Sequence, residues 1–383
     1  MSLKLLVIIS DRLSVLIQKG EVVARYYNPG NLFDEVHIMT TNDDQPDPDL
    51  VQPMVGRAKL FLHQMIPPNH FFRNTLGWQC LLMRRFSKEF LMKVGQIQPN
   101  LIRTHNNFLE GYLAVEAKRA LSIPFVTSLH GVWDCDDLVS LTSKIHHFFR
   151  KKIEKMVLNK ADAVICVYSS SMDYAKRYGC CSPLLIHNAV GGDFITTKIS
   201  EDLSNPIRLI TVNRQLSEKN PENIIKALDL LPYPIDYTII GDGIRHEALK
   251  DLAKGLDSTK RITFIKALSN QQVYQLYAQS DLMVSHCLYK GISKTIIEAG
   301  LFGLPIILNH YPDGYQLEEY KGDWIYQCQD TPEGYADALQ ALIISEKERK
   351  RLSQRAIAVT RAHFSPPVLE KRVCDLYQSL LSL

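Results

Sequence analysis

The chain has 383 residues, of which 46% are hydrophobic and 22% are charged, and 44 basic against 41 acidic side chains leave a net charge of +3. At roughly 150 residues per domain, this length predicts two or three domains that each bury a core. The composition is that of a folded globular protein, which excludes a disordered chain and a disulfide miniprotein, and the charge gives no reason to expect nucleic-acid binding.

The eight cysteines have neither Cys-x-x-Cys spacing nor histidine partners at metal-ligand spacing, so we expect reduced, mostly structural thiols and no bound metal. The opening segment, MSLKLLVIIS, has one basic residue and an apolar run too short for a signal peptide. No stretch approaches the roughly 18 apolar residues of a membrane span. These features predict a cytoplasmic protein.

In the first half of the chain, short apolar runs rich in β-branched residues predict strands. They are LKLLVIIS, VHIMT, NLIRTH, PFVTSLH, ADAVICVY and PLLIHN. Two amphipathic segments of helical length, EGYLAVEAKRAL and KIHHFFRKKIEKMVLNK, lie between some of these runs and predict helices.

The second half alternates strand and helix patterns more regularly, which predicts a parallel sheet covered by helices. The strands are IRLITVN, DYTIIG, RITFI, LMVSH and PIILN, and the helices are PENIIKALDLL, RHEALKDLAKGL, QQVYQLYAQ and KTIIEAGLFG. We therefore expect an α/β protein with two Rossmann-like, doubly wound domains. The expected boundaries are residues 1–190 for the first domain, 191–206 for a linker, 207–365 for the second domain and 366–383 for a helix that packs back on the first.

Two cations follow the first strand of the second domain. Arg214 leaves that strand and Lys219 lies five residues on, at the start of the next helix, so both can face the crevice at the ends of the strands. Two fixed positive charges there suit a diphosphate. A surface loop with solvated charges is an equally simple interpretation.

Two glycine-containing turns come later in this domain. Gly241-Asp242-Gly243 directly follows a strand, where glycines allow a ligand close to the backbone, although such a turn is often merely tight. Gly291 and Ser293 precede a helix whose first N–H groups form an anion site, with Ser293 as its N-cap. Glu298, on the second turn, can accept hydrogen bonds from a vicinal diol such as a ribose. A solvated carboxylate is the simpler alternative, but its neighbours are apolar.

In this order, Arg214 and Lys219, the Gly-Asp-Gly turn and KGISKTIIEAGLFGLP resemble the retaining, nucleotide-sugar-dependent glycosyltransferases of the GT-B fold, specifically family 4 or group 1. In the first half, IPFVTSLHG, ADAVICVYSS and LLIHNAVGGDF are similar to segments of the same family. The resemblance implies two domains that face a central crevice. It also implies transfer of a sugar from a UDP- or GDP-sugar to a glycan or lipid-linked glycan, as in bacterial surface polysaccharide biosynthesis, without a metal or other cofactor.

The resemblance also implies roles for single residues. Arg214 and Lys219 match the pair that neutralises the leaving diphosphate, and His130 resembles a histidine beside the donor sugar, with structural capping as its alternative. Glu298 matches the second carboxylate of the E-x7-E motif, which holds the ribose. The donor-binding residues are Gly241, Asp242, Gly243, Lys290, Gly291, Ile292, Ser293, Lys294, Thr295 and Glu298.

The sequence departs from the family in two places. Lys290 stands where the first carboxylate of E-x7-E belongs, and the loop after the first strand offers only Gly20 in place of a glycine-rich turn. One hypothesis is that the Lys290 ammonium pairs with the donor diphosphate or with an acidic sugar. The alternative is that it points to water.

The acceptor side is expected in the first domain. His105 and Asp134 are candidates to touch the acceptor. Residues 57–93 interleave basic and apolar side chains, which favours contact with an anionic membrane at its inner face or with a lipid-linked pyrophosphate. Helices with apolar faces in the core explain the same pattern. The basic residues of this segment are Arg57, Lys59, Arg73, Arg84, Arg85, Lys88 and Lys93.

Two other functions remain open at this point. A nucleotide-sugar 2-epimerase shares the fold but needs acid and base carboxylates, which we cannot place. A sugar-nucleotide-binding protein that has lost turnover is the non-enzymatic alternative, and the replacement of a motif carboxylate by Lys290 is its one supporting feature.

Overall fold

The computed structural model describes residues 2–68, 79–130, 141–190 and 202–382. The chain divides into two compact units. The first comprises Met1–Gly191 with Pro366–Leu383, so the last helix belongs to it, and the second is Gly192–Ser365. Asp134 lies outside the described residues.

The first unit is built on a parallel sheet of seven strands in the order β3-β2-β1-β4-β5-β6-β7. Its inner strands are buried on both faces, which is why they are continuous apolar runs in the sequence. The strands are β1 (Lys4–Ile9), β2 (Glu35–Thr40), β3 (Lys59–Gln64), β4 (Leu101–Thr104), β5 (Phe125–Leu129), β6 (Ala163–Cys166) and β7 (Leu184–Leu185).

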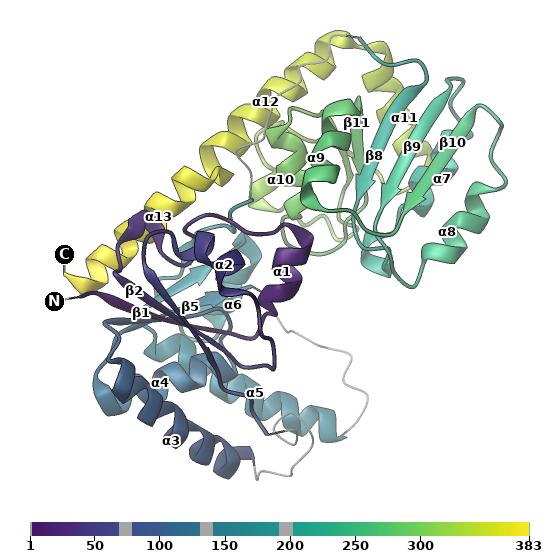
Figure 1. The fold of residues 1–383 in the computed structure, drawn as a ribbon. Coiled ribbons are helices and arrows are strands. Elements are labelled where there is room, and N and C mark those ends of the chain that lie inside the picture. The colour runs from purple at the N-terminus through teal and green to yellow at the C-terminus, as the bar shows by residue number, and fades with distance from the viewer. Residues whose placement is uncertain (1, 69–78, 131–140, 191–201, 383) are drawn as a thin grey trace. The chain divides into compact units, whose positions relative to one another are not determined.

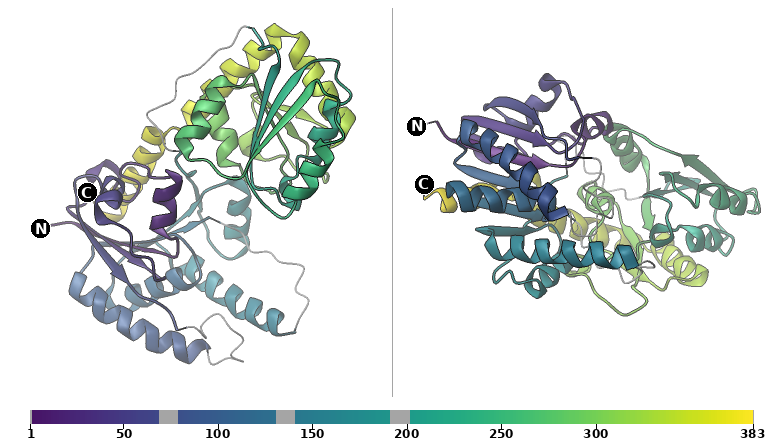
Figure 2. Two further views of the ribbon diagram at one scale, coloured as in Figure 1. Left: turned by 45° about the vertical axis from the view of Figure 1, so that its right-hand side comes forward. Right: turned by 90° about the horizontal axis from the view of Figure 1, so that it is seen from below.

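Helices cover both faces of this sheet (Figures 1 and 2). Against one face pack α3 (Gln79–Ile97), α4 (Leu109–Leu121) and α5 (Leu141–Lys160). Against the other lie α1 (Leu13–Lys19), α2 (Pro48–Val51), the 3-10 turns η1 (Pro29–Asn31) and η2 (Gln52–Val55), and α13 (Pro366–Leu381). Leu369 and Tyr377 of α13 are buried in that second core. A smaller cluster packs α6 (Ser169–Arg177) against β6.

The second unit repeats the plan with six parallel strands in the order β10-β9-β8-β11-β12-β13. The strands are β8 (Ile207–Val212), β9 (Ile235–Ile240), β10 (Lys260–Ile265), β11 (Leu282–Ser285), β12 (Ile306–Asn309) and β13 (Tyr326–Cys328).

One face of this sheet packs on α7 (Glu222–Leu228), α8 (His246–Ala253) and α11 (Pro332–Ile344), and the other on α9 (Asn270–Gln279) and α10 (Lys294–Leu301). The long helix α12 (Glu346–Phe364) contributes to both clusters, through Leu352 and Ala356. Short turns η3 (Ser217–Lys219) and η4 (Glu318–Tyr320) complete the unit.

The predicted α/β fold with two parallel, doubly wound sheets is confirmed. In each sheet the chain reverses its winding direction between the first strand and its neighbour, at β1 and β4 and at β8 and β11, and ligands of such folds bind outside the strand ends there. One expectation was incomplete. Residues 59–64, inside the basic stretch 57–93, form edge strand β3, where charged side chains are common because one side of the strand is unpaired.

Candidate active site

The loops after β8 and β9 are packed backbone against backbone. Gly241 has φ +136°, and a Cβ there would lie 1.8 Å from the Asn213 carbonyl oxygen, while a Cβ on Gly243 would lie 2.3 Å from that of Gln215. The Gln215 backbone N–H donates to the Asp242 carbonyl at 2.9 Å, and its side-chain Nε2 donates to the Gly241 carbonyl at 2.8 Å. The absence of side chains at Gly241 and Gly243 therefore lets the chain's own backbone pack against them, whereas the sequence suggested a ligand as their close neighbour.

Asp242 itself is at the surface. Its carboxylate accepts from the Gly243 N–H at 2.8 Å and forms a loose ion pair with Lys266 at 3.6 Å. These contacts, the backbone hydrogen bond first, lower the pKa of Asp242.

Two cations stand at the end of β8 without a neutralising partner. Arg214 is exposed and Lys219 is half-buried, and neither side chain has a hydrogen bond or ion pair within the described ranges. Burial raises the pKa of the Cys287 thiol, and the positive charge of Lys219 opposes that shift, so Lys219 lies near the end of β11. The switch point of the second sheet is thus positively charged.

Asn213 is a residue that the sequence did not single out. It follows β8 directly and is 8% exposed, yet neither its Oδ1 nor its Nδ2 has a hydrogen-bond partner among the residues that the structure describes. Buried polar atoms are nearly always satisfied, so this amide is suited to meet a ligand or water. Its signal in the sequence is its place, as the first polar residue after a buried strand at the switch point.

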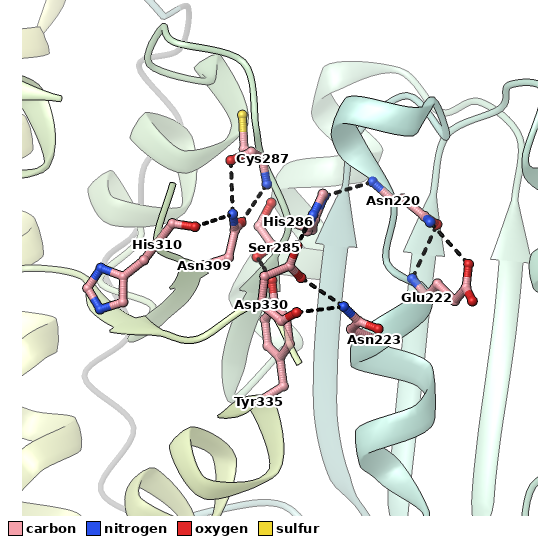
Figure 3. A network of polar contacts seen from close by, with 10 residues as sticks. All are labelled: Asn220, Glu222, Asn223, Ser285, His286, Cys287, Asn309, His310, Asp330 and Tyr335. Atoms are coloured by element: carbon pink, nitrogen blue, oxygen red, sulfur yellow. Dashed lines mark hydrogen bonds and ion pairs between the residues drawn. The ribbon is translucent and has the colours of Figure 1, made fainter. Parts of the chain in front are cut away.

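A histidine ties the end of β11 to the segment that carries Lys219 (Figure 3). The backbone N–H of Asn220 donates to His286 Nδ1 at 2.9 Å, so the other ring nitrogen, Nε2, carries the proton that is donated to Asp330 at 3.0 Å. Asn223 Nδ2 also donates to Asp330, at 3.0 Å. Burial alone raises the pKa of Asp330, but the hydrogen bonds from His286 and Asn223 outweigh it and the net shift is downward.

Asn309 holds the next residue of the same loop from both sides (Figure 3). Its Oδ1 accepts from the Cys287 N–H at 2.7 Å, and its Nδ2 donates to the Cys287 carbonyl at 3.2 Å. The loop that leads toward α10 is therefore fixed at its root.

Helix α10 begins as expected, with one difference. Ser293 has the extended backbone of an N-cap, but its hydroxyl bonds to Thr295 Oγ1 at 3.0 Å and makes no capping bond to the backbone. Gly291 is buried, with its N–H donated to the Tyr289 carbonyl at 2.8 Å, while Ile292, Lys294 and Thr295 are half-buried.

Glu298 is not a solvated helix residue. It is 5% exposed on α10, and the Tyr274 hydroxyl of α9 lies 3.5 Å from its Oε1. Its negative charge, after burial, raises the pKa of Tyr277. The carboxylate therefore lies between α10 and two tyrosines of α9.

In the first unit, His130 follows β5 and His105 follows β4, and their rings stack at 5.0 Å. The Tyr26 hydroxyl donates to Asn188 Oδ1 at 3.4 Å, which turns Asn188 Nδ2 toward His130 Nδ1 at 3.3 Å. The proton of a neutral His130 is then on Nε2, a buried atom without a partner in the described chain. Burial, followed by the charge of Arg103, lowers the pKa of His130 to about 3.

Two family models match the chain. One, described as glycosyl transferases group 1, covers residues 195–359, and the other, described as glycosyltransferase family 4, covers residues 32–191. The chain belongs to this glycosyltransferase family. The resemblance read from its motifs is confirmed, and the matches place Arg214, Lys219 and Glu298 inside the group 1 segment and His105 and His130 inside the other.

Curated relatives of this glycosyltransferase are distant. An uncharacterized glycosyltransferase of Methanocaldococcus jannaschii is 26% identical over 263 residues, which cover 63% of this chain and 64% of that protein. One of Haemophilus influenzae is 27% identical over 167 residues, 43% of this chain and 47% of that protein. The chain thus spans 64% and 47% of the lengths of these two relatives.

Solved structures share the whole fold at low identity. HepE of Anabaena in complex with UDP superposes with a TM-score of 0.74 at 15% identity, over 98% of this chain and 100% of that one. A sucrose-phosphate synthase from Thermosynechococcus elongatus gives a TM-score of 0.72 at 16% identity, over 99% of each chain. The fold of this glycosyltransferase is therefore the GT-B fold.

Lys290, which stands in place of the family's first motif carboxylate, forms an ion pair with Asp313. Lys290 Nζ lies 2.5 Å from Asp313 Oδ2 and 4.8 Å from the centre of the Tyr315 ring. Both charged side chains are about half exposed, at 48% and 54%. The hypothesis that Lys290 reaches the donor thus competes with an internal ion pair.

The family's glycine-rich loop after the first strand is also replaced. Helix α1 starts at Leu13, and the Asp44 carboxylate accepts from both the N–H and the hydroxyl of Ser14 at its beginning. Gly20 instead ends the helix in a left-handed conformation with φ 72°. The N-terminus of this glycosyltransferase's first helix is thus occupied by the Asp44 side chain.

In its described residues, 57–68 and 79–93, the basic stretch packs as the simpler of its two interpretations expects, and Arg73 lies outside the described residues. In α3 the apolar residues Phe86, Phe90 and Val94 are buried in the core, while Arg84, Arg85 and Lys88 are exposed. Lys93 Nζ donates to the Gln64 carbonyl at 3.1 Å. The apolar face is thus used for packing on the sheet, and the basic face remains on the surface.

The described residues contain neither a membrane-spanning helix nor a metal-binding cluster. None of the helices traced there has the length and apolar character needed to cross a membrane. The same residues hold no group of three or more side chains arranged to bind a metal ion. The described cysteines, which are Cys166, Cys180, Cys181, Cys287, Cys328 and Cys374, are free.

Proposed function

We propose that this protein is a retaining glycosyltransferase that moves a sugar from a UDP- or GDP-sugar to a glycan or lipid-linked glycan, in the synthesis of a surface polysaccharide. The observation that carries the proposal is the pair Arg214 and Lys219, two cations without partners in the described chain at the switch point of the second sheet. UDP is our first choice of nucleotide, because the structurally similar HepE binds UDP and UDP-glucose.

In the proposed reaction, the bond between the anomeric carbon and the β-phosphate oxygen breaks, and the electron pair stays on the nucleoside diphosphate. Arg214 and Lys219 stabilise the negative charge that develops there, and because the chain already holds them in place, no reorganisation is needed during reaction. The acceptor hydroxyl bonds to the anomeric carbon from the face that the phosphate leaves. Its proton passes to the departing phosphate, so no side-chain base is required.

Three further residues have proposed roles in recognition. Glu298 accepts hydrogen bonds from the ribose in exchange for its long 3.5 Å contact with Tyr274. Asn213 offers its buried amide to the donor. His130 donates its Nε2–H to a sugar hydroxyl, and because its pKa is about 3 it remains a neutral donor near pH 7 and does not act as a charged acid.

We propose that His105 and Asp134 contact the acceptor. We also propose that the exposed basic face of α3 brings the enzyme to an anionic membrane at the cytoplasmic face. Arg84, Arg85 and Lys88 form that face. Alpha-monoglucosyldiacylglycerol synthase of Streptococcus pneumoniae is 23% identical over 77% of this chain. The name of that relative supports a lipid-linked acceptor.

A thermal-shift screen against UDP, GDP, ADP, dTDP and CMP tests the donor site. A nucleotide at one hundred times its dissociation constant adds about 2.7 kcal/mol to the folded state. We expect one diphosphate to raise the melting temperature of the wild type but not of Lys219→Ala or Glu298→Ala. Lys254→Ala, which removes a 76% exposed lysine paired with Asp251, is the control and should respond like the wild type.

The activity itself is tested by incubating the protein with the stabilising nucleotide's sugars. Transfer or slow donor hydrolysis supports the proposal, and Lys219→Ala should lower the rate about 100- to 1,000-fold. An isomerised sugar nucleotide points to an epimerase, and binding without turnover points to a non-catalytic protein. If no nucleotide stabilises the wild type, the donor site is wrong.

A further inference from the structure

A second polar site lies entirely within the first unit, between the sheet and α13. It is a small, partly open pocket of about 50 Å³. Ile165, Ile186 and Leu369 supply apolar walls. The polar lining is Arg25, Tyr26, Arg103, His187, Asn188 and Glu370.

Arg103 is the unusual member of this lining. It lies on β4, is 8% exposed, and faces the same core as α13. Its Nη1 donates to the Tyr377 hydroxyl at 2.8 Å, but its buried Nε has no partner. Within the parts of the chain that the structure describes, no carboxylate lies within 4.0 Å of its guanidinium.

The carboxylates nearby are committed elsewhere. Glu370, which shares the pocket, accepts from Arg25 Nε at 2.6 Å and Nη2 at 2.8 Å and from the Gly30 N–H at 2.8 Å. Asp11 is exposed to solvent, and desolvation followed by the charge of Glu21 raises its pKa, which is the opposite of what a nearby guanidinium would cause. Arg25 and Glu370 neutralise one another, so Arg103 leaves the pocket with one uncompensated positive charge.

The other polar groups of the lining do not neutralise that charge. His187 Nδ1 is bonded to the Val167 carbonyl at 2.9 Å, and Asn188 bridges Tyr26 and His130. Burial lowers the pKa values of His105 and His130 most. The charge of Arg103 comes next for His130, and for His105 it follows the charge of His130, so the field of Arg103 reaches these two rings outside the pocket lining. A histidine ring is either neutral or positively charged, so neither ring supplies a counter-charge to the guanidinium.

A buried guanidinium is costly unless an anion pairs with it, and its planar fork of N–H donors matches a carboxylate or a phosphate. We propose that the pocket beneath α13 is a binding site for a small anionic group, a carboxylate or a phosphate monoester, held by Arg103. The site uses no residue of the donor site and does not depend on the proposed function. The anion is either carried by an acceptor or bound as a free ion.

The test titrates the full chain with inorganic phosphate and with acetate at constant ionic strength and follows the melting temperature and the heat of binding. Because phosphate can also bind at Arg214 and Lys219, the parent protein carries Arg214→Ala and Lys219→Ala. We expect a saturable stabilisation of this parent by at least one of the two anions. Arg103→Met in that background should weaken binding about tenfold or more.

Arg261→Met is the control, because it removes an arginine outside the pocket lining. The Arg261 side chain is 74% exposed, and its guanidinium already forms a two-point ion pair with Asp236. This control should bind the anion like the parent. In chloride without added anion, Arg103→Met should be no less stable than the parent, since it removes a buried charge whose described partner is a neutral hydroxyl and not a carboxylate. If that variant does not fold, Arg103→Lys keeps the charge without the fork, and its binding should be weaker than the parent's.

The absence of a saturable response in the parent, or an equal response in Arg103→Met, overturns the proposal. Neither result touches the donor site, which the nucleotide screen of the wild type measures separately. Once an acceptor is known, inhibition of transfer by phosphate that competes with the acceptor assigns the site to an acceptor-borne anion. An effect of phosphate that does not compete assigns it to a free anion.

Discussion

The two units have the same strand order over their first six strands but differ at the ends of those strands. In the second unit, Gln215 joins the loops after β8 and β9, and His286 joins the end of β11 to Asn220. In the first, Arg103 Nε, Asn107 Nδ2, Ser128 Oγ and His130 Nε2 are buried without partners around the ends of β4 and β5. Within the described residues, the loops of the second edge are thus bound to one another and leave the Asn213 amide unsatisfied beside them, whereas the first edge leaves buried donors around both β4 and β5.

The largest expected effect breaks the backbone packing of the second unit. Gly241→Ala places a methyl group where only 1.8 Å separates it from the Asn213 carbonyl, at φ +136°. We expect a loss of at least about 3 kcal/mol in the free energy of unfolding, measured with urea. Gly255→Ala, where the nearest atom is 3.6 Å away, should change it by less than about 1 kcal/mol. Equal effects of the two would mean that the loops do not pack this way.

The next effect concerns the carboxylate that holds His286. Asp330→Asn should cost about 1 to 2 kcal/mol at pH 7, because a charge-assisted hydrogen bond is replaced by a neutral one. The folded-state pKa of Asp330 is lowered, so its contribution is present above pH 3.8 and is lost as the pH falls through the folded value. The difference from the wild type should therefore shrink below pH 3.8.

Urea unfolding at several pH values measures this loss, with Asp251→Asn as the control. Asp251 is 70% exposed and paired with the surface residue Lys254, so its replacement should be nearly neutral. A difference between Asp330→Asn and the wild type that stays constant down to pH 3 would contradict the assignment.

The first unit should lose stability at a higher pH than the one at which Asp330 is protonated, because it contains neutral buried histidines. Burial, followed by the charge of His63, lowers the pKa of His37 to about 4, so the unfolded chain binds a proton before the folded one does. Stability should then decline as the pH falls from about 6.5 to 4. His37→Gln should reduce the decline between pH 7 and pH 5 by about 1 to 2 kcal/mol. The exposed His363→Gln is the control, and an identical decline in the two variants would refute the role of His37.

The smallest effect is expected for Lys290→Met. Its ion pair with Asp313 is about half exposed, and such pairs contribute less than about 1 kcal/mol. We expect an unchanged nucleotide response as well, because the ammonium already has a carboxylate. A lost nucleotide response would instead favour the hypothesis that Lys290 contacts the donor.

Most strands that the sequence predicted are buried on both faces, such as β1 (Lys4–Ile9) and β11 (Leu282–Ser285), although the partly buried edge strands β7 and β10 were predicted as well. Strands β3 and β13 were not predicted, since they lie near or at the edges of their sheets and are only partly buried, so no continuous apolar run marks them. The parts of the site that the sequence predicted are also local. Arg214, Lys219 and the Gly-Asp-Gly turn lie close to strand ends in the sequence, and their positions follow from local patterns.

The sequence by itself determined the fold class, the positions of the main strands and helices, and the family, because these depend on periodicity and on motifs whose residues are near one another. Only the tertiary structure decided which polar groups meet. His286 reaches Asp330 across 44 residues, and Arg103 reaches Tyr377 across 274. A pattern along the chain carries no signal for such pairs, since the distance between them is set by how the sheet and its covering helices pack.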